Sequence, residues 1–296
     1  MPMMLGMKTT PIRTLLSLCV AVLLAGCADE PATPERAIDA RAAVLDAMRA
    51  SYEAGTVHQE LRMSMSSGGQ SFLFSGEGDV DTDHRLASVT MDLGMLGGSM
   101  DMIVDGPVVY MRSSVFGQQG VPTEWISLDA SKMDPSVAGQ FGGGAGMVDP
   151  SAYSGLFAGV VDVEVVGDET IDGVATTRYG GTIDLQRVVE EFPSILGEDA
   201  NQAQTRALRQ ALDQFEALGI EGRIPFEIWI DDDGLPRRQT ISMDLGEMLG
   251  GEDVDASIEI RVDYSAYGEP IEVDIPKPSQ VTDLTEELSA GGSLQG

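Results

Sequence analysis

The residue of this chain with the clearest chemistry is Cys27, which ends the sequence Leu24-Ala25-Gly26-Cys27. It closes a run of 13 uncharged residues, 14–26, that follows Lys8 and Arg13. Such a run is too short to cross a membrane as a helix but has the usual length of an export-signal core. Small residues before a cysteine match a lipobox, in which the thiol takes a diacylglyceryl group before cleavage. We therefore expect residues 1–26 to be a lipoprotein signal peptide and Cys27 to carry lipid.

The alternative interpretation is an ordinary secretory signal with an incidental cysteine. The only other cysteine, Cys19, lies inside the signal, so the exported part can form no internal disulfide. Residues 27–34 contain two prolines and are expected to be a lipidated tether. A diacylglycerol on Cys27 supplies two acyl chains, which is enough for stable anchoring. We expect the protein to be held at the cell membrane by this lipid, on the extracytoplasmic face.

The histidines and aspartates of the chain form no recognisable metal site. His58 and His84 each lack a second histidine at ligand spacing. The segment from Asp79 to Asp83 begins like a calcium-binding loop, but His84 stands where such a loop needs Gly and Thr90 stands where it needs Glu. We interpret this segment as a turn, and Asp231-Asp232-Asp233-Gly234 as the turn of a hairpin. No metal is expected.

Motifs of known enzyme classes are also missing from the sequence. It contains no Gly-x-Ser-x-Gly, no Ser-x-x-Lys and no Gly-Lys-Ser/Thr, which are typical of serine hydrolases, penicillin-binding enzymes and phosphate-binding loops. The sequence does not exclude a catalytic pair of carboxylates, because with 48 Asp and Glu some acidic side chains lie close together in any fold. We therefore expect that the protein is not an enzyme and that it has neither a catalytic residue nor a cofactor.

The chain is strongly acidic, with a net charge of −30. Two of the 18 Lys and Arg and none of the 48 Asp and Glu lie in residues 1–26, so the exported part has a net charge of −32. Clustered basic residues are needed to bind phosphates, so this balance argues against nucleic acid and against adhesion of the protein surface to anionic headgroups. Solubility outside the cell is a sufficient explanation of the acidity.

The sequence predicts one helix followed by strands in the first half of the exported chain. An apolar stripe over 35–52 predicts the helix. Alternation of apolar and polar residues then predicts antiparallel strands, which cover 57–65, 72–80, 85–93, 100–105, 108–112 and 125–129.

The second half returns to strands after the glycine-rich segment 139–146 and a short helix over 150–157. Turn residues and alternation predict strands over 161–166, 174–185, 224–230, 237–245 and 256–264. A helix is expected over 199–218, where apolar residues recur at helical spacing and Gly219 follows the end. The polar tail after 278 is expected to be loose.

Methionine is frequent, and 12 of the 16 methionines lie after the signal, many at the inward positions of the predicted strands. Methionine fills irregular or adaptable apolar surfaces, although ordinary core packing would also explain it. Residues 89–98 and 241–251 share the pattern Met-Asp-Leu-Gly followed by Met-Leu-Gly-Gly. They could be related hairpins beside one opening, but a single short match favours chance.

The order of these parts resembles the LppX/LprG-type lipoproteins of mycobacteria and their actinobacterial relatives. The resemblance covers about 35–285 and is carried by two segments, VVGDETIDGVATTRY at 165–179 and PFEIWIDDDGLPR at 225–237. It implies an α+β fold of the LolA-like class, a strongly curved antiparallel half-barrel with helices packed on its concave side. It also implies a single lipid-binding domain over 35–285, followed by a flexible tail over 286–296.

The same resemblance implies a function. The protein would shelter acyl chains of a lipid or lipoglycan in an apolar cavity during transfer across the cell envelope, as a monomer with an envelope transporter as a candidate partner. The alternative is a regulatory or structural lipoprotein of the same fold that acts through protein contacts. We expect the cavity to be lined by the helix over 199–218 and by alternate strand residues, namely Leu61, Met63, Met91, Met102, Ile228, Met243 and Ile260.

Overall fold

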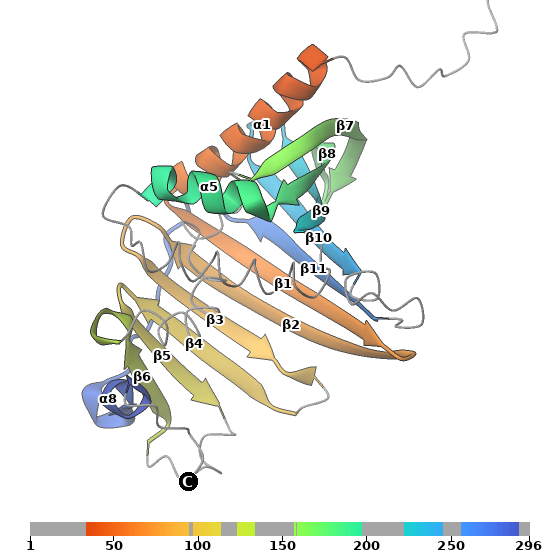
Figure 1. Ribbon diagram of the computed structural model, residues 1–296. Helices are drawn as coiled ribbons and strands as arrows, with labels where there is room; N and C mark the ends of the chain where they lie inside the picture. The colour runs from red at the N-terminus through yellow and green to blue at the C-terminus, as the bar shows by residue number, and fades with distance from the viewer. Residues whose placement is uncertain are drawn as a thin grey trace, which may run out of the picture. The chain divides into compact units, whose positions relative to one another are not determined.

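The computed structural model describes residues 34–94, 97–113, 123–133, 157, 159–196, 222–244 and 256–289 (Figure 1). The chain divides into two units, residues 1–33 and 34–296, and every described residue belongs to the second. The helices within the described residues are α1 (Pro34–Glu53), α5 (Leu185–Leu196) and α8 (Thr285–Ser289), with short 3₁₀ turns at Ala130–Lys132 and Pro278–Gln280. Among these helices, none is both long enough and apolar enough to span a membrane.

The strands form one twelve-stranded sheet. They are β1 (Thr56–Ser67), β2 (Gln70–Asp81), β3 (Leu86–Asp92), β4 (Ser99–Asp105), β5 (Val108–Ser113), β6 (Trp125–Asp129), β7 (Val160–Ile171), β8 (Val174–Asp184), β9 (Arg223–Asp231), β10 (Pro236–Asp244), β11 (Ala256–Ser265) and β12 (Val281–Asp283). Their order across the sheet is β12-β6-β5-β4-β3-β2-β1-β11-β10-β9-β8-β7. All neighbours are antiparallel except β12 and β6, and β1 pairs with β11 in the middle of the sheet.

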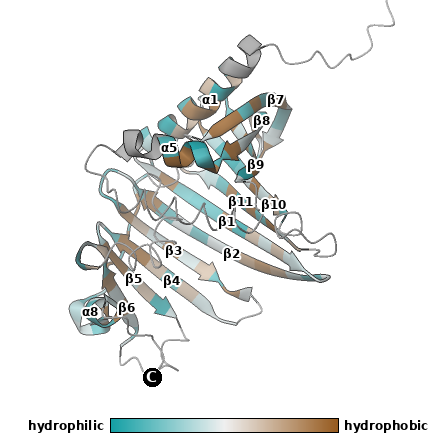
Figure 2. Cartoon of the chain, viewed as in Figure 1, coloured by the Kyte–Doolittle hydropathy of each residue, from teal (hydrophilic) through white to brown (hydrophobic). Residues whose placement is uncertain are grey.

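The two faces of the sheet differ in chemistry, as Figure 2 shows by the alternation of hydrophobic and hydrophilic residues along the strands. Because side chains alternate across a strand, the register fixes which residues share a face. Leu61 lies opposite Val262 and Gly76, and Met63 opposite Ile260 and Phe74. We call this apolar side the inner face.

The opposite, outer face carries the charges. Arg238 pairs with Asp263 across β10 and β11, and Arg178 pairs with Glu227 across β8 and β9. The Arg178 guanidinium also lies 5.0 Å from the ring centroid of Trp229, a cation–π contact. A sheet with one charged and one apolar face must bury the apolar side against something else.

Glycines on the inner face of β2 allow a tight approach to β3. A Cβ built on Gly78 would collide with the carbonyl oxygen of Ser88 and would lie 2.7 Å from Val89 Cγ2. A Cβ on Gly76 would lie 3.1 Å from Met91 Cγ. Inward-facing groups crowd together where a sheet curls toward them, so these glycines permit the curvature of the sheet at this point.

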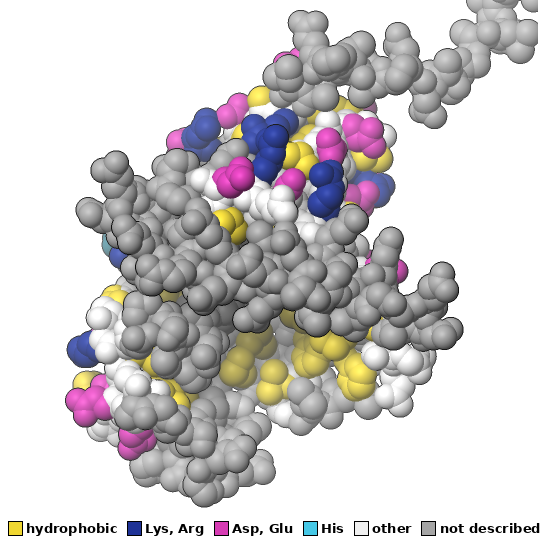
Figure 3. Space-filling view, viewed as in Figure 1, with side chains coloured by type: hydrophobic (Ala, Val, Ile, Leu, Met, Phe, Trp, Pro, Cys, Tyr) yellow, Lys and Arg dark blue, Asp and Glu magenta, His cyan; other side chains and the backbone are white. Residues whose placement is uncertain are grey.

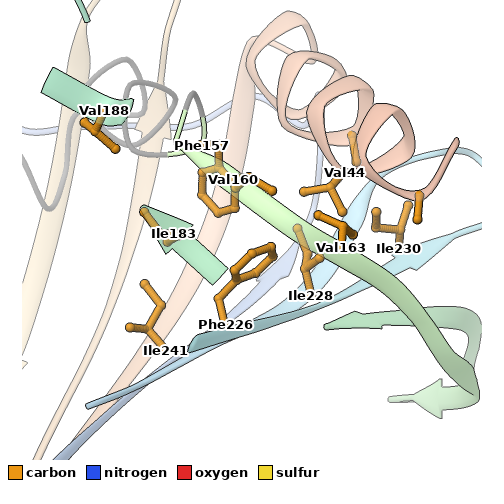
Figure 4. Close-up of a cluster of buried hydrophobic side chains, with 12 residues drawn as sticks. Val44, Phe157, Val160, Val163, Ile183, Val188, Phe226, Ile228, Ile230 and Ile241 are labelled. Carbon is orange, nitrogen blue, oxygen red and sulfur yellow. The ribbon is translucent and has the colours of Figure 1, made fainter. Parts of the chain in front are cut away.

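Helix α1 covers the inner face at the β7–β10 end. Ala40, Val44 and Ala47 lie on one stripe of the helix and are buried. They pack with residues of the inner face and of α5. Figure 4 shows Val44 on the helix, with Val163 and Ile228 on the strands below it. Helix α8 also packs on the inner side, where Leu284 and Leu288 meet Ile126 of β6. The predicted fold class, a curved antiparallel sheet with helices on its inner side, is confirmed.

Two hairpin turns follow directly from their sequences. Asp172 and Gly173 join β7 to β8 with positive φ angles of 49° and 86°, as a two-residue turn of this type requires. In the turn from β9 to β10, Asp231 Oδ1 accepts hydrogen bonds from the backbone N–H groups of Asp233 and Leu235. Its Oδ2 accepts one from Arg237 Nε at 2.6 Å. The second segment that carries the family resemblance is therefore a turn closed by its own side chains.

The structure differs from the sequence expectations at two places. The tail after 278 is not loose as far as Ser289, because β12 pairs with β6 and Leu288 of α8 is buried. Helix α5 was not predicted. Asp184 caps it by accepting hydrogen bonds from the N–H groups of Gln186 and Arg187. The strand expected over 174–185 includes this capping aspartate, so the start of the helix was not recognised. The predicted helix over 199–218 lies outside the described residues, as does that over 150–157 apart from Phe157.

Candidate functional site

The seven strand residues predicted to line a cavity all fall on the inner face. The strand register pairs Met63 with Ile260, Met91 with Met100 and Met102 with Val89. Ile228 lies opposite Tyr179 and Gln239, and Met243 lies opposite Ile258. Period-two alternation therefore brings together residues from six strands, β1, β3, β4, β9, β10 and β11, that are far apart in the sequence. Whether they enclose a cavity stays a proposal.

These residues differ in how deeply they are buried. Ile228 and Met102 belong to two packed hydrophobic clusters. Met63, Met91 and Met243 are only half-buried. They are continuous with other half-buried inner-face residues, and we call the whole set the methionine face. It consists of Met63, Met65, Phe72, Phe74, Met91, Met243 and Ile258.

The methionine face runs over five neighbouring strands, from β3 through β2, β1 and β11 to β10. In Figure 3, hydrophobic side chains gather in a hollow over the part of the sheet where Figure 1 places β1 to β3. The inner-face positions that the register pairs between these five strands carry no charged residue. An apolar chain laid across them would therefore meet carbon and sulfur atoms, which suits a hydrocarbon ligand.

Three polar side chains interrupt the inner face beside the methionine face, and sequence reasoning missed them. Gln59 of β1 lies directly opposite Tyr264 of β11. The Tyr264 hydroxyl donates a hydrogen bond of 3.1 Å to Oε1 of Gln239 on β10. We call these three residues the polar belt. Gln239 occupies an inward position between apolar neighbours, and that position was the only sequence signal.

Burial changes the ionisation of two tyrosines, Tyr179 at the covered end and Tyr267 beside the cluster that holds Val57 and Tyr264. It raises the pKa of the Tyr179 phenol on the inner face of β8. It also raises the pKa of Tyr267, whose hydroxyl donates a hydrogen bond of 2.7 Å to the carbonyl oxygen of Pro236. Both phenols therefore stay neutral near pH 7, and neither supplies a charge to the inner face.

The remaining candidates for chemistry have structural roles where the structure describes them. His58 Nδ1 lies 2.8 Å from Asp79 Oδ1, and His84 Nδ1 lies 2.8 Å from Asp81 Oδ2. Of the calcium-like segment 79–83, which was interpreted as a turn, the first three residues end β2 and only the last two lie in the turn 82–85 between β2 and β3. Over the described ranges, no group of three or more His, Cys, Asp or Glu could hold a metal ion. Cys27 lies outside these ranges.

The structure thus defines a class of fold in which an open, curved antiparallel sheet carries helices on its apolar inner face. Within that class, the chain belongs to the LppX_LprAFG lipoprotein family, which it matches over residues 39–214, more than half of its length. The family resemblance noted in the sequence is thereby confirmed. The match covers most of α1, strands β1 to β8 and α5.

Individual relatives are distant. An uncharacterized 31.2 kDa protein of Streptomyces griseus is 30% identical over 135 residues, which are 46% of this chain and 39% of that protein. This chain thus spans about two-fifths of that relative's length. Among solved structures, LprF from Mycobacterium bovis is 17% identical with a TM-score of 0.47, covering 81% of this chain and 97% of LprF. LppX from Mycobacterium tuberculosis is 19% identical with a TM-score of 0.42, covering 79% and 99%.

Proposed function

We propose that this protein is a membrane-anchored carrier that holds the acyl chains of a lipid or lipoglycan against its inner face and transfers them across the cell envelope. The lipid on Cys27 anchors it to the extracytoplasmic face of the membrane, and residues 27–34 let the folded unit stand away from the bilayer. The protein binds and releases its cargo and carries out no chemical reaction.

The observation that carries this proposal is the methionine face. Its side chains lie on the apolar side of a curved sheet but are only half-buried, while the covered end of the same face is fully packed. A large half-exposed apolar surface is unfavourable in water unless something covers it. Each methylene group of a lipid that moves out of water onto such a surface gains about 0.8 kcal/mol. An acyl chain would complete the burial that the described residues leave unfinished.

The first test is to look for bound lipid. Residues 28–296, which include the whole unit that begins at Pro34, would be expressed in an actinobacterial host and purified without detergent. Organic extraction and mass spectrometry should then show about one lipid per protein molecule. A folded protein that carries no lipid and takes up none when lipid is added would contradict the proposal. It would instead favour a lipoprotein that acts through protein contacts.

A matched pair of variants tests where the lipid binds. Met91→Asp places a charge on the methionine face, whereas Leu73→Asp makes the same kind of change on the outer face of neighbouring β2, where Leu73 is 60% exposed. We expect Met91→Asp to lose most of its lipid and Leu73→Asp to keep it, because a carboxylate on an apolar surface must shed its water when lipid covers it. If folded Met91→Asp still carries lipid, this lining is wrong.

The anchor has its own test. Replacing Cys27 by Ser should move the protein from the membrane fraction to the soluble fraction and abolish labelling by radioactive fatty acid, because the serine hydroxyl cannot form the thioether. This test concerns only the anchor, because the lipid content of the Met91→Asp variant reports on the binding surface and does not depend on Cys27. Unchanged membrane attachment of Cys27→Ser would contradict the assignment of the lipobox.

A further inference from the structure

The polar belt holds a hydrogen-bonding group without a partner in an otherwise apolar region. Gln239 is 1% exposed, and its Nε2 donates to no acceptor among the described residues. Its Oε1 is engaged by Tyr264. In this orientation, which lets the Tyr264 hydroxyl donate to Oε1, the atom left without a partner in the described part of the chain is the Nε2 donor. Leaving such a group unpaired costs about 1–3 kcal/mol, and proteins avoid that cost unless the group has a use.

The position of Gln239 links it to the methionine face. It lies on the inner face of β10, two residues before Ile241 and four before Met243. Residues rise about 3.4 Å each along an antiparallel strand, so the amide row lies about 7 Å from the row of Ile241, Ile260 and Met63 and about 14 Å from that of Met243. A ligand that extends along β10 and β11 over the methionine face would therefore bring one end to the polar belt.

The chemistry of the belt selects what that end can be. As it is placed, the amide N–H needs an acceptor. The arginine two residues before it along β10, Arg237, is already paired with Asp231 and does not supply a free positive charge for a carboxylate. Burying an unpaired charge there costs far more than burying a neutral carbonyl. An ester carbonyl accepts a hydrogen bond, carries no charge and occurs where an acyl chain begins. Free fatty acids and plain hydrocarbons lack this combination.

We propose that Gln239 is the specificity-determining residue of the lipid site and that its side-chain amide donates a hydrogen bond to the ester carbonyl of a bound acylglycerol. Tyr264 positions the amide by holding Oε1, and the acyl chain runs from the ester over the methionine face toward the turn between β1 and β2. This assignment rests on the proposed function, because it names the polar group that the same site recognises.

The test compares a lipid that has ester carbonyls with one that lacks them. The full-length chain, purified from membranes in mild detergent, would be mixed with equal amounts of a diacylglycerol and the dialkyl ether of the same chain length. Native mass spectrometry then gives the ratio of the two bound forms in one experiment. One hydrogen bond is worth about 1 kcal/mol, so we expect the wild-type protein to favour the ester about five-fold.

Three variants locate the source of that preference. Gln239→Met keeps the length of the side chain but cannot donate, and its ester-to-ether ratio should fall to about one. Tyr264→Phe leaves the amide unsupported and should lower the ratio partly. Thr240→Val changes the next residue along β10, which faces outward opposite Arg261 and Glu227, and should leave the ratio unchanged. Thermal unfolding of each variant shows that it is folded.

The outcomes separate the two proposals. If wild-type protein binds ester and ether equally, or if Gln239→Met keeps the preference, the role of Gln239 is wrong while lipid carriage stands. The amide would then serve only the fold. If wild-type protein binds neither lipid, the proposed function itself fails and the assignment of Gln239 fails with it.

Discussion

The two ends of the inner face are built from different side chains and reach different degrees of burial. At the β7–β10 end, α1 and α5 pack with β-branched and aromatic residues of the sheet, and Val44, Val160 and Ile228 are fully buried. On the methionine face, long flexible side chains stay half-buried. One continuous sheet thus combines a fixed core with an adaptable surface. The stability of the protein should reside in the first region and its binding in the second.

The chemistry of the side chains fits this division. Valine and isoleucine have few rotamers and pack into a defined shape. Methionine has three rotatable bonds and a polarizable sulfur, so it adjusts to ligands of different shape. If the covered end supplies stability and the methionine face supplies binding, substitutions at the covered end should change the free energy of unfolding and those on the methionine face should change lipid binding.

The largest effect on stability is expected from Phe226→Ala at the covered end. Phe226 is 2% exposed, and its ring meets that of Phe157 edge to face with centroids 5.7 Å apart. Removing a buried aromatic side chain leaves a cavity and costs about 3–5 kcal/mol. Urea denaturation followed by circular dichroism should show this loss. Met65→Ala on the methionine face, as the control, should cost about 1 kcal/mol or less, and equal losses would refute the division.

A smaller loss is expected from Gly78→Ala at the tight approach of β2 to β3. The added Cβ would meet the backbone of Ser88 and Val89, which cannot move without changing the curvature of the sheet. Overpacking of this kind costs about 1–3 kcal/mol. Gly180→Ala provides the control, because its Cβ would meet only Val166 Cγ2 at 3.2 Å. If Gly78→Ala and the wild-type protein unfold at the same urea concentration, the curvature does not depend on this glycine.

Alkaline pH should weaken the fold through Tyr267, which packs against the cluster that holds Val57 and Tyr264. Burial raises the pKa of its phenol in the folded protein above the value of about 10 in the unfolded chain. The native state therefore keeps a proton that the unfolded state has lost, so the stabilisation is complete below pH 10 and falls above it by up to about 1.4 kcal/mol per pH unit. The thermal midpoint of Tyr267→Phe, measured from pH 9 to 11, should fall less steeply than that of wild type. Parallel curves would contradict this assignment.

The smallest effect on stability is expected when Met63, Met65 and Met91 are each replaced by Leu. The volumes are similar and the sites are half-buried, so each change should cost less than about 0.5 kcal/mol. Binding should change more, because branched leucine adapts less well than methionine. The range of acyl chain lengths found by mass spectrometry should narrow. An unchanged range would show that adaptability does not depend on methionine.

The strands were predictable because alternation is a local signal that survives folding. Met63 and Ile260 could be assigned to one face from their own strands, and the Asp-Gly turn at 172–173 fixed a hairpin. β12 could not be predicted, because a three-residue strand has no period to detect and pairs with β6, about 150 residues away in the chain.

The polar belt escaped prediction for a different reason. An apolar pattern marks positions that face inward, and Gln239 breaks the pattern at such a position. Counting back in steps of two from Met243 places Gln239 inward, but a polar residue at such a position does not show from the sequence alone that it is buried. Its burial becomes visible only when Ile228 and Val262 are placed on either side of it by the register of β9, β10 and β11. A missing hydrogen-bond partner is a property of the assembled sheet and has no sequence signal.

The pairing of β1 with β11 has a consequence for how the chain is made. The two strands are separated by about 190 residues, and they join the two halves of the sheet. Synthesis at about 5–20 residues per second leaves β1 without this neighbour for roughly 10–40 s. During that time, the apolar side of the first half-sheet and the open edge of β1 can pair with other chains. The nascent protein should therefore depend on chaperones, or on export in an unfolded form, until β11 has emerged.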